Sequence, residues 1–280
     1  MGVFPMTSRS DFKSGYAPSG AASLYFETIG EGSALVFIHA GVSDSRMWDP
    51  QFEAFASRFQ VVRYDHRGFG KSATPEGSYA LRDDLLAVLR HLGVAQATLV
   101  GCSMGGATAI DFTLEHPEMV TALVLVGSGV TGLNDPSQLS DATIKYWTEF
   151  LKAIRDGDVD RAREMDAKHW IDGPLRDASR IDPVYRECAR QLHRENFSLQ
   201  RSTTQEQPLK PAAIGRLGEI KVPTLVVIGD NDEPDLLKLA DRLAREIPNA
   251  TKVPIKNAAH LPSLEHPALF NQILSDFLKR

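Results

Sequence analysis

The chain has 280 residues, of which 42% are hydrophobic and 24% are charged, and its formal net charge is −5. These values are typical of a globular protein with one large domain, or with a core domain and a smaller insertion. The charges are scattered and form no basic stripe, so we expect neither nucleic acid nor a membrane as a partner. No apolar run approaches the ~18 residues that span a bilayer, and we expect no signal peptide. Two cysteines, Cys102 and Cys188, form no disulfide framework, so we expect a cytoplasmic location.

The first 130 residues alternate between short apolar runs and segments of helical periodicity. Residues 1–21 are rich in Ser, Gly and Pro, and we expect them to form a loose segment. The later pattern predicts strands at 24–28, 35–38, 60–64, 97–100 and 123–126, and helices at 48–58, 79–92 and 104–116. Strands separated by helices indicate a mostly parallel sheet with helices on both faces.

The alternation stops after this point and returns later. No buried β run is found from 140 to 211, where the periodicity predicts helices at 140–156, 158–171 and 182–199. Strands are then predicted at 222–228 and 251–255, with helices at 234–247 and from 265 onward. We therefore predict an α/β fold whose core comprises residues 22–130 and 212–280, with a helical lid at 131–211 inserted between two strands.

The pentapeptide Gly101-Cys102-Ser103-Met104-Gly105 lies where a predicted strand gives way to a predicted helix. The pattern Gly-x-Ser-x-Gly at such a junction is that of a nucleophile elbow. A strand that turns sharply into a helix leaves no room for side chains two residues before and two residues after the serine, which explains the glycines. The serine hydroxyl then projects beside the N-terminus of a helix, where N–H groups can stabilise an oxyanion. The alternative is a Gly/Ser-rich turn without chemistry.

A serine nucleophile needs a base and an acid that orients the base. His260 follows the last predicted strand, so it should lie at the same sheet edge as Ser103. Acidic residues, among them Asp230 and Asp232, follow the strand that ends at Ile228. The chain order Ser, Asp, His is that of the α/β-hydrolase triad. For His260 alone a structural role would be the simpler interpretation; three such residues at strand ends favour catalysis.

These motifs, together with two others, make the chain resemble the α/β-hydrolase superfamily over nearly its whole length. Phe37-Ile38-His39-Ala40-Gly41 is similar to the oxyanion loop of that family, and Tyr64-Asp65-His66-Arg67-Gly68-Phe69-Gly70-Lys71-Ser72 is similar to its Asp-x-Arg-Gly-x-Gly-x-Ser turn. Ala40 departs from the usual glycine, although Gly41 follows. The resemblance favours Asp232 over Asp230 as the acid. It also implies an oxyanion hole formed by the backbone N–H groups of Gly41 and Met104.

The segment Arg46-Met47-Trp48-Asp49-Pro50-Gln51 most resembles 3-oxoadipate enol-lactonases and related small esterases. The resemblance implies a hydrolase that cleaves a small carboxylic ester or lactone through an acyl-enzyme. No cofactor and no metal site are expected. C–C bond hydrolases and cofactor-free perhydrolases share the triad and stay open, as does a non-catalytic receptor for a small molecule. Dimerisation is also open. Candidate pocket residues are Trp48, Trp147, Phe150 and Trp170.

Overall fold

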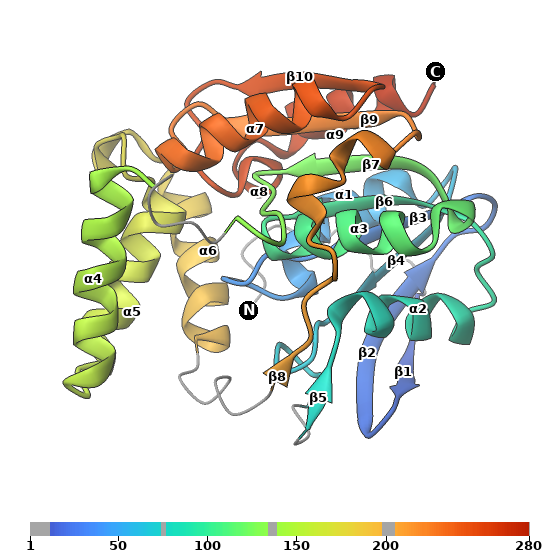
Figure 1. Cartoon of the computed structure of the whole chain (residues 1–280), viewed down its shortest axis with the longest axis horizontal. Helices are drawn as coiled ribbons and strands as arrows, with labels where there is room; N and C mark the ends of the chain where they lie inside the picture. The colour runs from blue at the N-terminus through green and yellow to red at the C-terminus, as the bar shows by residue number, and fades with distance from the viewer. Residues whose placement is uncertain (1–11, 74–76, 134–138, 198–204, 280) are drawn as a thin grey trace.

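The computed structural model describes residues 12–73, 77–133, 139–197 and 205–279. Its centre is an eight-stranded sheet with the order β1-β2-β4-β3-β6-β7-β9-β10 (Figure 1). The strands of this sheet are β1 (Lys13–Ser19), β2 (Ala22–Ile29), β3 (Ala34–Ile38), β4 (Gln60–Tyr64), β6 (Ala97–Cys102), β7 (Val120–Val126), β9 (Thr224–Gly229) and β10 (Ala250–Ile255). From β4 to β10 all neighbouring strands are parallel, so the ends that carry the candidate residues share one edge.

The N-terminal part of the chain differs from the sequence expectation. Residues 13–19 were expected to be loose, but they form β1, which pairs antiparallel with β2 in a register that sets Tyr16 opposite Tyr25. β2 in turn pairs antiparallel with β4. The backbone pairing with β2 decides the structure here, despite the Ser, Gly and Pro content. Residues 1–11 lie outside the described residues.

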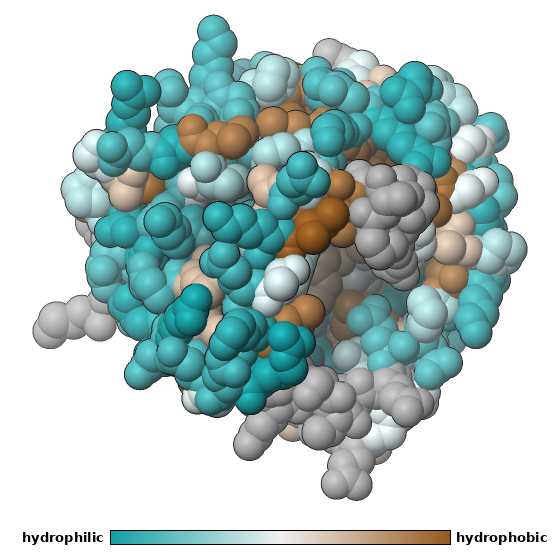
Figure 2. Space-filling view, turned by 60° about the vertical axis from the view of Figure 1, so that its left-hand side comes forward, coloured by the Kyte–Doolittle hydropathy of each residue, from teal (hydrophilic) through white to brown (hydrophobic). Residues whose placement is uncertain are grey.

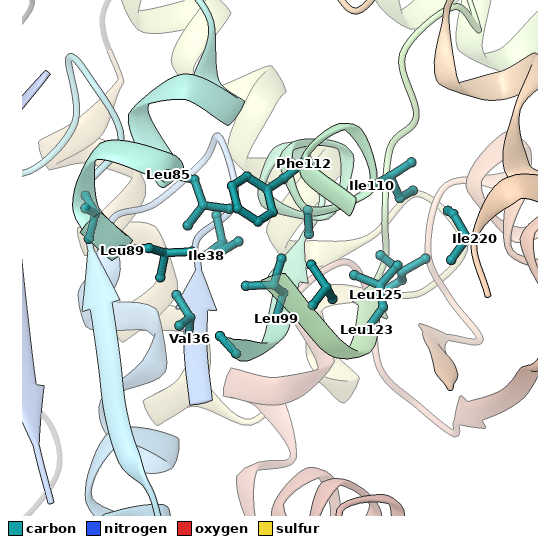
Figure 3. Close-up of a cluster of buried hydrophobic side chains, with 14 of the residues drawn as sticks. Val36, Ile38, Leu85, Leu89, Leu99, Ile110, Phe112, Leu123, Leu125 and Ile220 are labelled. Atoms are coloured by element: carbon teal, nitrogen blue, oxygen red, sulfur yellow. The ribbon is translucent and has the colours of Figure 1, made fainter. Parts of the chain in front are cut away.

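Side chains alternate along the central strands and form a hydrophobic cluster on each face of the sheet. On one face, Val36, Ile38, Leu99, Leu123 and Leu125 pack against helices α2, α3 and α7 (Figure 3). On the other face, the intervening residues of the same strands pack against α1, α9 and part of the insertion. The helices around the sheet are α1 (Asp49–Phe55), α2 (Leu81–His91), α3 (Met104–Glu115), α7 (Pro234–Glu246), α8 (Pro262–Glu265) and α9 (Pro267–Phe277). Burial on both faces explains why these strands read as continuous apolar runs.

Between β7 and β9 the described chain is mainly helical, and α4, α5 and α6 lie together at one end of the molecule (Figure 1). The helices here are α4 (Asp141–Arg155), α5 (Val159–Ala167), the π-helix η4 (Lys168–Asp172), the 3-10 helix η5 (Ala178–Arg180) and α6 (Pro183–Asn196). The segment ends with β8 (Gln205–Glu206), a two-residue strand absent from the prediction, which pairs with β5 (Ser78–Tyr79). Further 3-10 helices are η1 (Ser45–Trp48), η2 (Pro117–Met119), η7 (Ala213–Gly215) and η8 (Leu217–Glu219).

The two ends of this helical segment lie side by side. The backbone N–H of Ile214 donates to the carbonyl of Thr131 (3.1 Å), and the N–H of Ala213 donates to the Thr131 hydroxyl (3.3 Å). Thr131 in turn donates to Asp111 on α3 (2.7 Å). The helical segment therefore leaves and re-enters the core at one point. No helix among the described residues is long and apolar enough to cross a membrane.

Candidate active site

Ser103 lies at the turn between β6 and α3, at the edge of the sheet. Its φ of 54° and ψ of −113° are rare for a residue other than glycine, and such backbone strain is common at functional sites. The surrounding backbone holds it in this conformation. Its N–H donates to Val126 (2.9 Å), and its carbonyl accepts from Ala107 and Gly129 (3.1 Å each).

Close approach of backbones explains both glycines of the elbow. A Cβ atom on Gly101 would lie 2.3 Å from the carbonyl oxygen of Gly105. A Cβ atom on Gly105 would lie 2.3 Å from the carbonyl oxygen of Ile38 in the neighbouring strand. Both distances are far shorter than van der Waals contact. The pentapeptide thus has its glycines where the strand–turn–helix geometry requires them.

The loop after β3 lies against the first residue of α3. A Cβ atom on Gly41 would be 3.7 Å from the sulfur of Met104. The loop is fastened by His39, whose Nε2 accepts from the N–H of His66 (2.8 Å) and whose Nδ1 is 2.8 Å from the carbonyl of Ala40. Met104 opens α3, and first-turn N–H groups have no partner within their own helix. The arrangement leaves such N–H groups beside Ser103.

His260 and Asp232 form a buried pair, and both residues are 1% exposed. The Nδ1 atom of His260 lies 3.1 Å from each carboxylate oxygen of Asp232. Because a carboxylate only accepts, Nδ1 carries the proton and Nε2 is the atom left to accept one. The N–H of Glu233 donates to Asp232 (2.8 Å). Asp230 is exposed and accepts from Asn231, so the geometry selects Asp232 for contact with the histidine.

The end of β7 links Ser103 with the His260–Asp232 pair. Ser103 bonds to Val126, and a Cβ atom on the next residue, Gly127, would lie 3.2 Å from Nδ1 of His260 and 3.1 Å from Asp232. The thiol of Cys102, immediately before Ser103, donates to the carbonyl of His260 (3.7 Å). Burial raises the pKa of this thiol well above its usual range, which suits packing and not nucleophilic attack. The three candidate residues therefore gather around one strand end.

The sequence of the chain matches that of a known protein family. The sequence model of the alpha/beta hydrolase fold matches residues 33–267. The chain belongs to the α/β-hydrolase fold family. A hydrolase of 2-hydroxy-6-oxononadienedioate and 2-hydroxy-6-oxononatrienedioate from Paraburkholderia phymatum is 33% identical over 274 residues, covering 91% of this chain and 90% of the relative. The 3-oxoadipate enol-lactonase 2 of Acinetobacter baylyi is 26% identical over 264 residues, covering 92% of this chain and 94% of that protein.

The solved structures agree with this assignment. The enol-lactonase of Burkholderia xenovorans LB400 has a TM-score of 0.77 at 25% identity, covering 95% of this chain and 100% of that structure. The α/β-hydrolase fold and the resemblance to enol-lactonases that the motifs indicated are therefore confirmed.

In this α/β hydrolase the helical insertion supplies an aromatic neighbour for His260. The ring of Trp170, in η4, lies 4.6 Å from the His260 ring between centroids, at an angle of 46°. Of the candidate pocket residues, Trp170 thus contacts the His260–Asp232 pair. The side of the molecule where α4–α6 lie is mostly hydrophilic and is hollowed near its centre, where hydrophobic side chains reach the surface (Figure 2).

Two residues near Trp170 were not predicted. His169 stacks on Tyr146 at 3.7 Å and contacts the Trp170 ring at 4.6 Å. The pKa of His169 is lowered to about 4, mainly by burial and to a smaller extent by the nearby His260. The ring of His169 is therefore neutral at pH 7. Tyr146 donates to Asp166 (2.7 Å), and burial raises its pKa. Helical periodicity shows that a helix has a buried face but not what lies against that face. The sequence therefore did not predict that His169 and Tyr146 lie near Trp170.

The other three candidate pocket residues contact other aromatic side chains. Trp48 is fully buried between Phe37 and Phe270, at centroid distances of 5.0 and 6.0 Å. It belongs to the hydrophobic cluster that packs against α1 and α9, and its role as a pocket residue stays a prediction. Trp147 and Phe150 lie on α4 and both contact Tyr146, at 5.1 and 5.8 Å, and Trp147 is 39% exposed.

The residues around the site bear on two further questions, whether a metal ion could bind there and which charged side chains form ion pairs. Among the described residues, no cluster of three or more His, Cys, Asp or Glu could hold a metal ion. Arginines in and beside the insertion are paired with carboxylates: Arg46 with Asp44 and Glu195, Arg176 with Glu265, and Arg186 and Arg190 with Asp172.

Proposed function

We propose that this chain is a cofactor-free serine hydrolase that cleaves a carboxylic ester or lactone. Ser103 is the nucleophile, His260 the general base and Asp232 the orienting acid. The observation that carries the proposal is the strained Ser103 turn beside a buried His260–Asp232 pair in which Nδ1 faces the carboxylate. The enol-lactonase relatives support the reaction class.

The reaction then proceeds in two acyl transfers, first from the substrate to Ser103 and then from Ser103 to water. Nε2 of His260 takes the Ser103 proton as the oxygen attacks the carbonyl, and Asp232 stabilises the imidazolium that forms. The N–H groups of Gly41 and Met104 donate to the oxyanion, each contributing about 3 kcal/mol of transition-state stabilisation. The protonated His260 then gives its proton to the leaving alcohol oxygen. A water deprotonated by the same histidine releases the acyl group, and Ser103 regains its proton.

We further propose that the insertion, residues 131–211, acts as the lid of this site and that the substrate group beneath it is uncharged. The residues near His260, namely Trp170, His169 and Tyr146, present aromatic surface. The lowered pKa of His169 and the raised pKa of Tyr146 keep both side chains neutral at pH 7. Uncharged aromatic walls favour an uncharged acyl or alcohol group, since a buried carboxylate needs a charged partner.

A C–C bond hydrolase on the same residues is the second candidate, because the 33% identical relative is named for cleaving dicarboxylates. The neutral side chains near His260 favour an uncharged ester or lactone over such a dicarboxylate. A comparison of kcat/KM for a neutral p-nitrophenyl ester, a neutral lactone and 2-hydroxy-6-oxononatrienedioate separates the two. We expect the neutral substrates to be preferred, and a larger kcat/KM for the dicarboxylate would favour C–C hydrolysis.

The nucleophile is tested with an organophosphonate probe and intact-protein mass spectrometry. The wild type should gain one phosphonyl group and turn over p-nitrophenyl acetate, whereas Ser103→Ala should do neither. Cys102→Ala is the matched control, because it changes the neighbouring side chain, and it should still be labelled. A wild type that neither reacts with the probe nor cleaves any ester would overturn the hydrolase proposal and favour a non-catalytic receptor.

A further inference from the structure

Arg176 joins the insertion to the segment that carries His260. Its side chain is 5% exposed and lies in the loop between η4 and η5, against Glu265 of α8, which is 3% exposed. Nη1 donates to Glu265 (2.5 Å) and to the carbonyl of Asn257 (2.7 Å), and Nη2 donates to the second Glu265 oxygen (3.1 Å). The same guanidinium donates to the carbonyls of Asp172 (2.6 Å) and Ile171 (3.3 Å) in η4. One side chain thus bridges two regions far apart in sequence.

Glu265 carries this connection to the residue next to His260. The carboxylate oxygen that accepts from Nη2 of Arg176 also accepts from the N–H of Ala259 (3.0 Å). Because Ala259 directly precedes His260, Arg176 and Glu265 together hold the backbone on that side of the imidazole. A buried, bidentate arginine–carboxylate pair is suited to fixing such a geometry.

The same part of the insertion also touches the loop that carries Asp232. A Cβ atom on Gly173, which follows η4, would lie 2.8 Å from the Cβ of Ala259 and 2.9 Å from the carbonyl of Asn231. Asn231 in turn donates its N–H to the carbonyl of Ala258 (2.9 Å). The backbones that carry the base and the acid therefore lie against one short segment of the insertion.

A second set of contacts holds η4 without touching the His260 segment. The Asp172 carboxylate accepts from Arg186 (2.8 Å) and Arg190 (2.5 Å), both on α6. These pairs fasten η4 to another helix of the insertion. Arg186 therefore provides a matched control for Arg176: its loss should loosen the insertion without releasing the loop before His260.

We propose that Arg176 is a positioning residue that, through Glu265 and the Asn257–Ala259 backbone, sets the orientation of His260 and couples it to the insertion. The proposal rests on the assignment of His260 as the base. Without the guanidinium, Glu265 keeps a buried carboxylate with no cation beside it, and such unpaired buried charges rearrange their surroundings. The segment before His260 then shifts relative to Ser103.

The test compares Arg176→Met, Arg176→Lys and Arg186→Met, with kcat and KM measured on a neutral p-nitrophenyl ester. We expect Arg176→Met to lower kcat about 10- to 100-fold while KM changes by less than about 3-fold, because small misplacements of a base act on the chemical step. Its phosphonylation by the organophosphonate should slow by a similar factor. Arg176→Lys should recover part of kcat, whereas Arg186→Met should keep kcat within about 3-fold of the wild type.

Thermal melts of all three variants show whether they are folded. If Arg176→Met does not fold, Arg176→Lys decides the matter, since an ammonium cannot bridge both Glu265 oxygens and the Asn257 carbonyl in the same plane. The proposal is overturned if Arg176→Lys keeps the wild-type kcat, or if Arg176→Met and Arg186→Met lose kcat equally. An inactive, unlabelled wild type is a different result, which overturns the hydrolase assignment itself.

Discussion

The sheet and the helical insertion are held together in different ways. The central strands are apolar on both faces and pair through backbone hydrogen bonds, and Ser103, Asp232 and His260 all lie at their ends. The insertion has amphipathic helices that are linked through buried or half-buried charged side chains, such as Asp172 with Arg186 and Arg190. The ends of the strands thus position the candidate catalytic residues, and the insertion adds Trp170 as a neighbour of His260.

The two regions meet at several points around the site. Trp170 lies against His260, and Arg176 bonds to the segment just before it. Gly173 also lies against the loop that carries Asp232, and Thr143 on α4 donates to Glu233, the residue after Asp232. Changes to the candidate triad and to Arg176 should therefore affect reaction with every substrate, whereas a change to Trp170 should separate one substrate from another.

The largest effect is expected from a substitution of Asp232, the candidate acid, which lies in the core. Asp232→Asn should lower kcat about 10⁴-fold for every ester tested, because the amide no longer selects the tautomer that leaves Nε2 free to accept a proton. Asp230→Asn is the matched control on the same loop and should keep wild-type kcat. Steady-state assays with two unrelated esters check both claims. Full activity in Asp232→Asn would remove this residue from the triad and reopen the choice of acid.

The next effect concerns the elbow backbone. Gly105→Ala should lower the free energy of unfolding by about 1–3 kcal/mol, because the new methyl group would lie 2.3 Å from the carbonyl oxygen of Ile38. Gly215→Ala is the control, since nothing lies within 4 Å of a Cβ atom there. Urea denaturation of both variants measures the difference. Equal stability would mean that β3 can move away from α3, and the elbow would then be less rigid than its geometry indicates.

More of the structure of the core than of the insertion could be predicted from the sequence, for a physical reason. Gly101 and Gly105 are required by backbone contacts, and a strand end determines where the next residue lies, so Ser103 and His260 could be placed from local pattern. The choice of Asp232 over Asp230 came from the resemblance to the family. β1 was missed because its pairing with β2 outweighs a Ser-, Gly- and Pro-rich composition. In the insertion, periodicity indicates a buried face but not its partner. Tyr146 and His169 were missed for that reason.

A smaller effect, confined to some substrates, is expected from the insertion. Trp170→Ala should lower kcat/KM about 10-fold for esters with a large apolar group, because it removes the aromatic surface next to His260. The effect on p-nitrophenyl acetate should be less than about 3-fold. Trp147→Ala, which alters a 39% exposed tryptophan on α4, should change neither value by more than about 3-fold. Equal losses for large and small esters would mean that Trp170 supports the base and does not select the substrate.

The smallest effect is expected where the insertion meets the core, at Asp111. This residue lines a cavity of about 40 Å³ together with Met104 and Glu206, and it accepts a hydrogen bond from Thr131 (2.7 Å). Burial raises the pKa of Asp111 to about 6, so the folded state disfavours its charged form. The destabilisation is absent below pH 3.8, the ordinary pKa, grows as pH rises toward 6, and is complete above that.

Asp111→Asn keeps the acceptor for Thr131 and carries no charge. It should therefore raise the free energy of unfolding by about 1 kcal/mol at pH 7.5, after allowing for partial solvent access, and by much less at pH 4. Urea titrations at the two pH values measure this difference, with Asp230→Asn on the surface as the control. A gain that is the same at both pH values would mean that folding does not raise the pKa of Asp111, and that burial of its charge costs nothing at this junction.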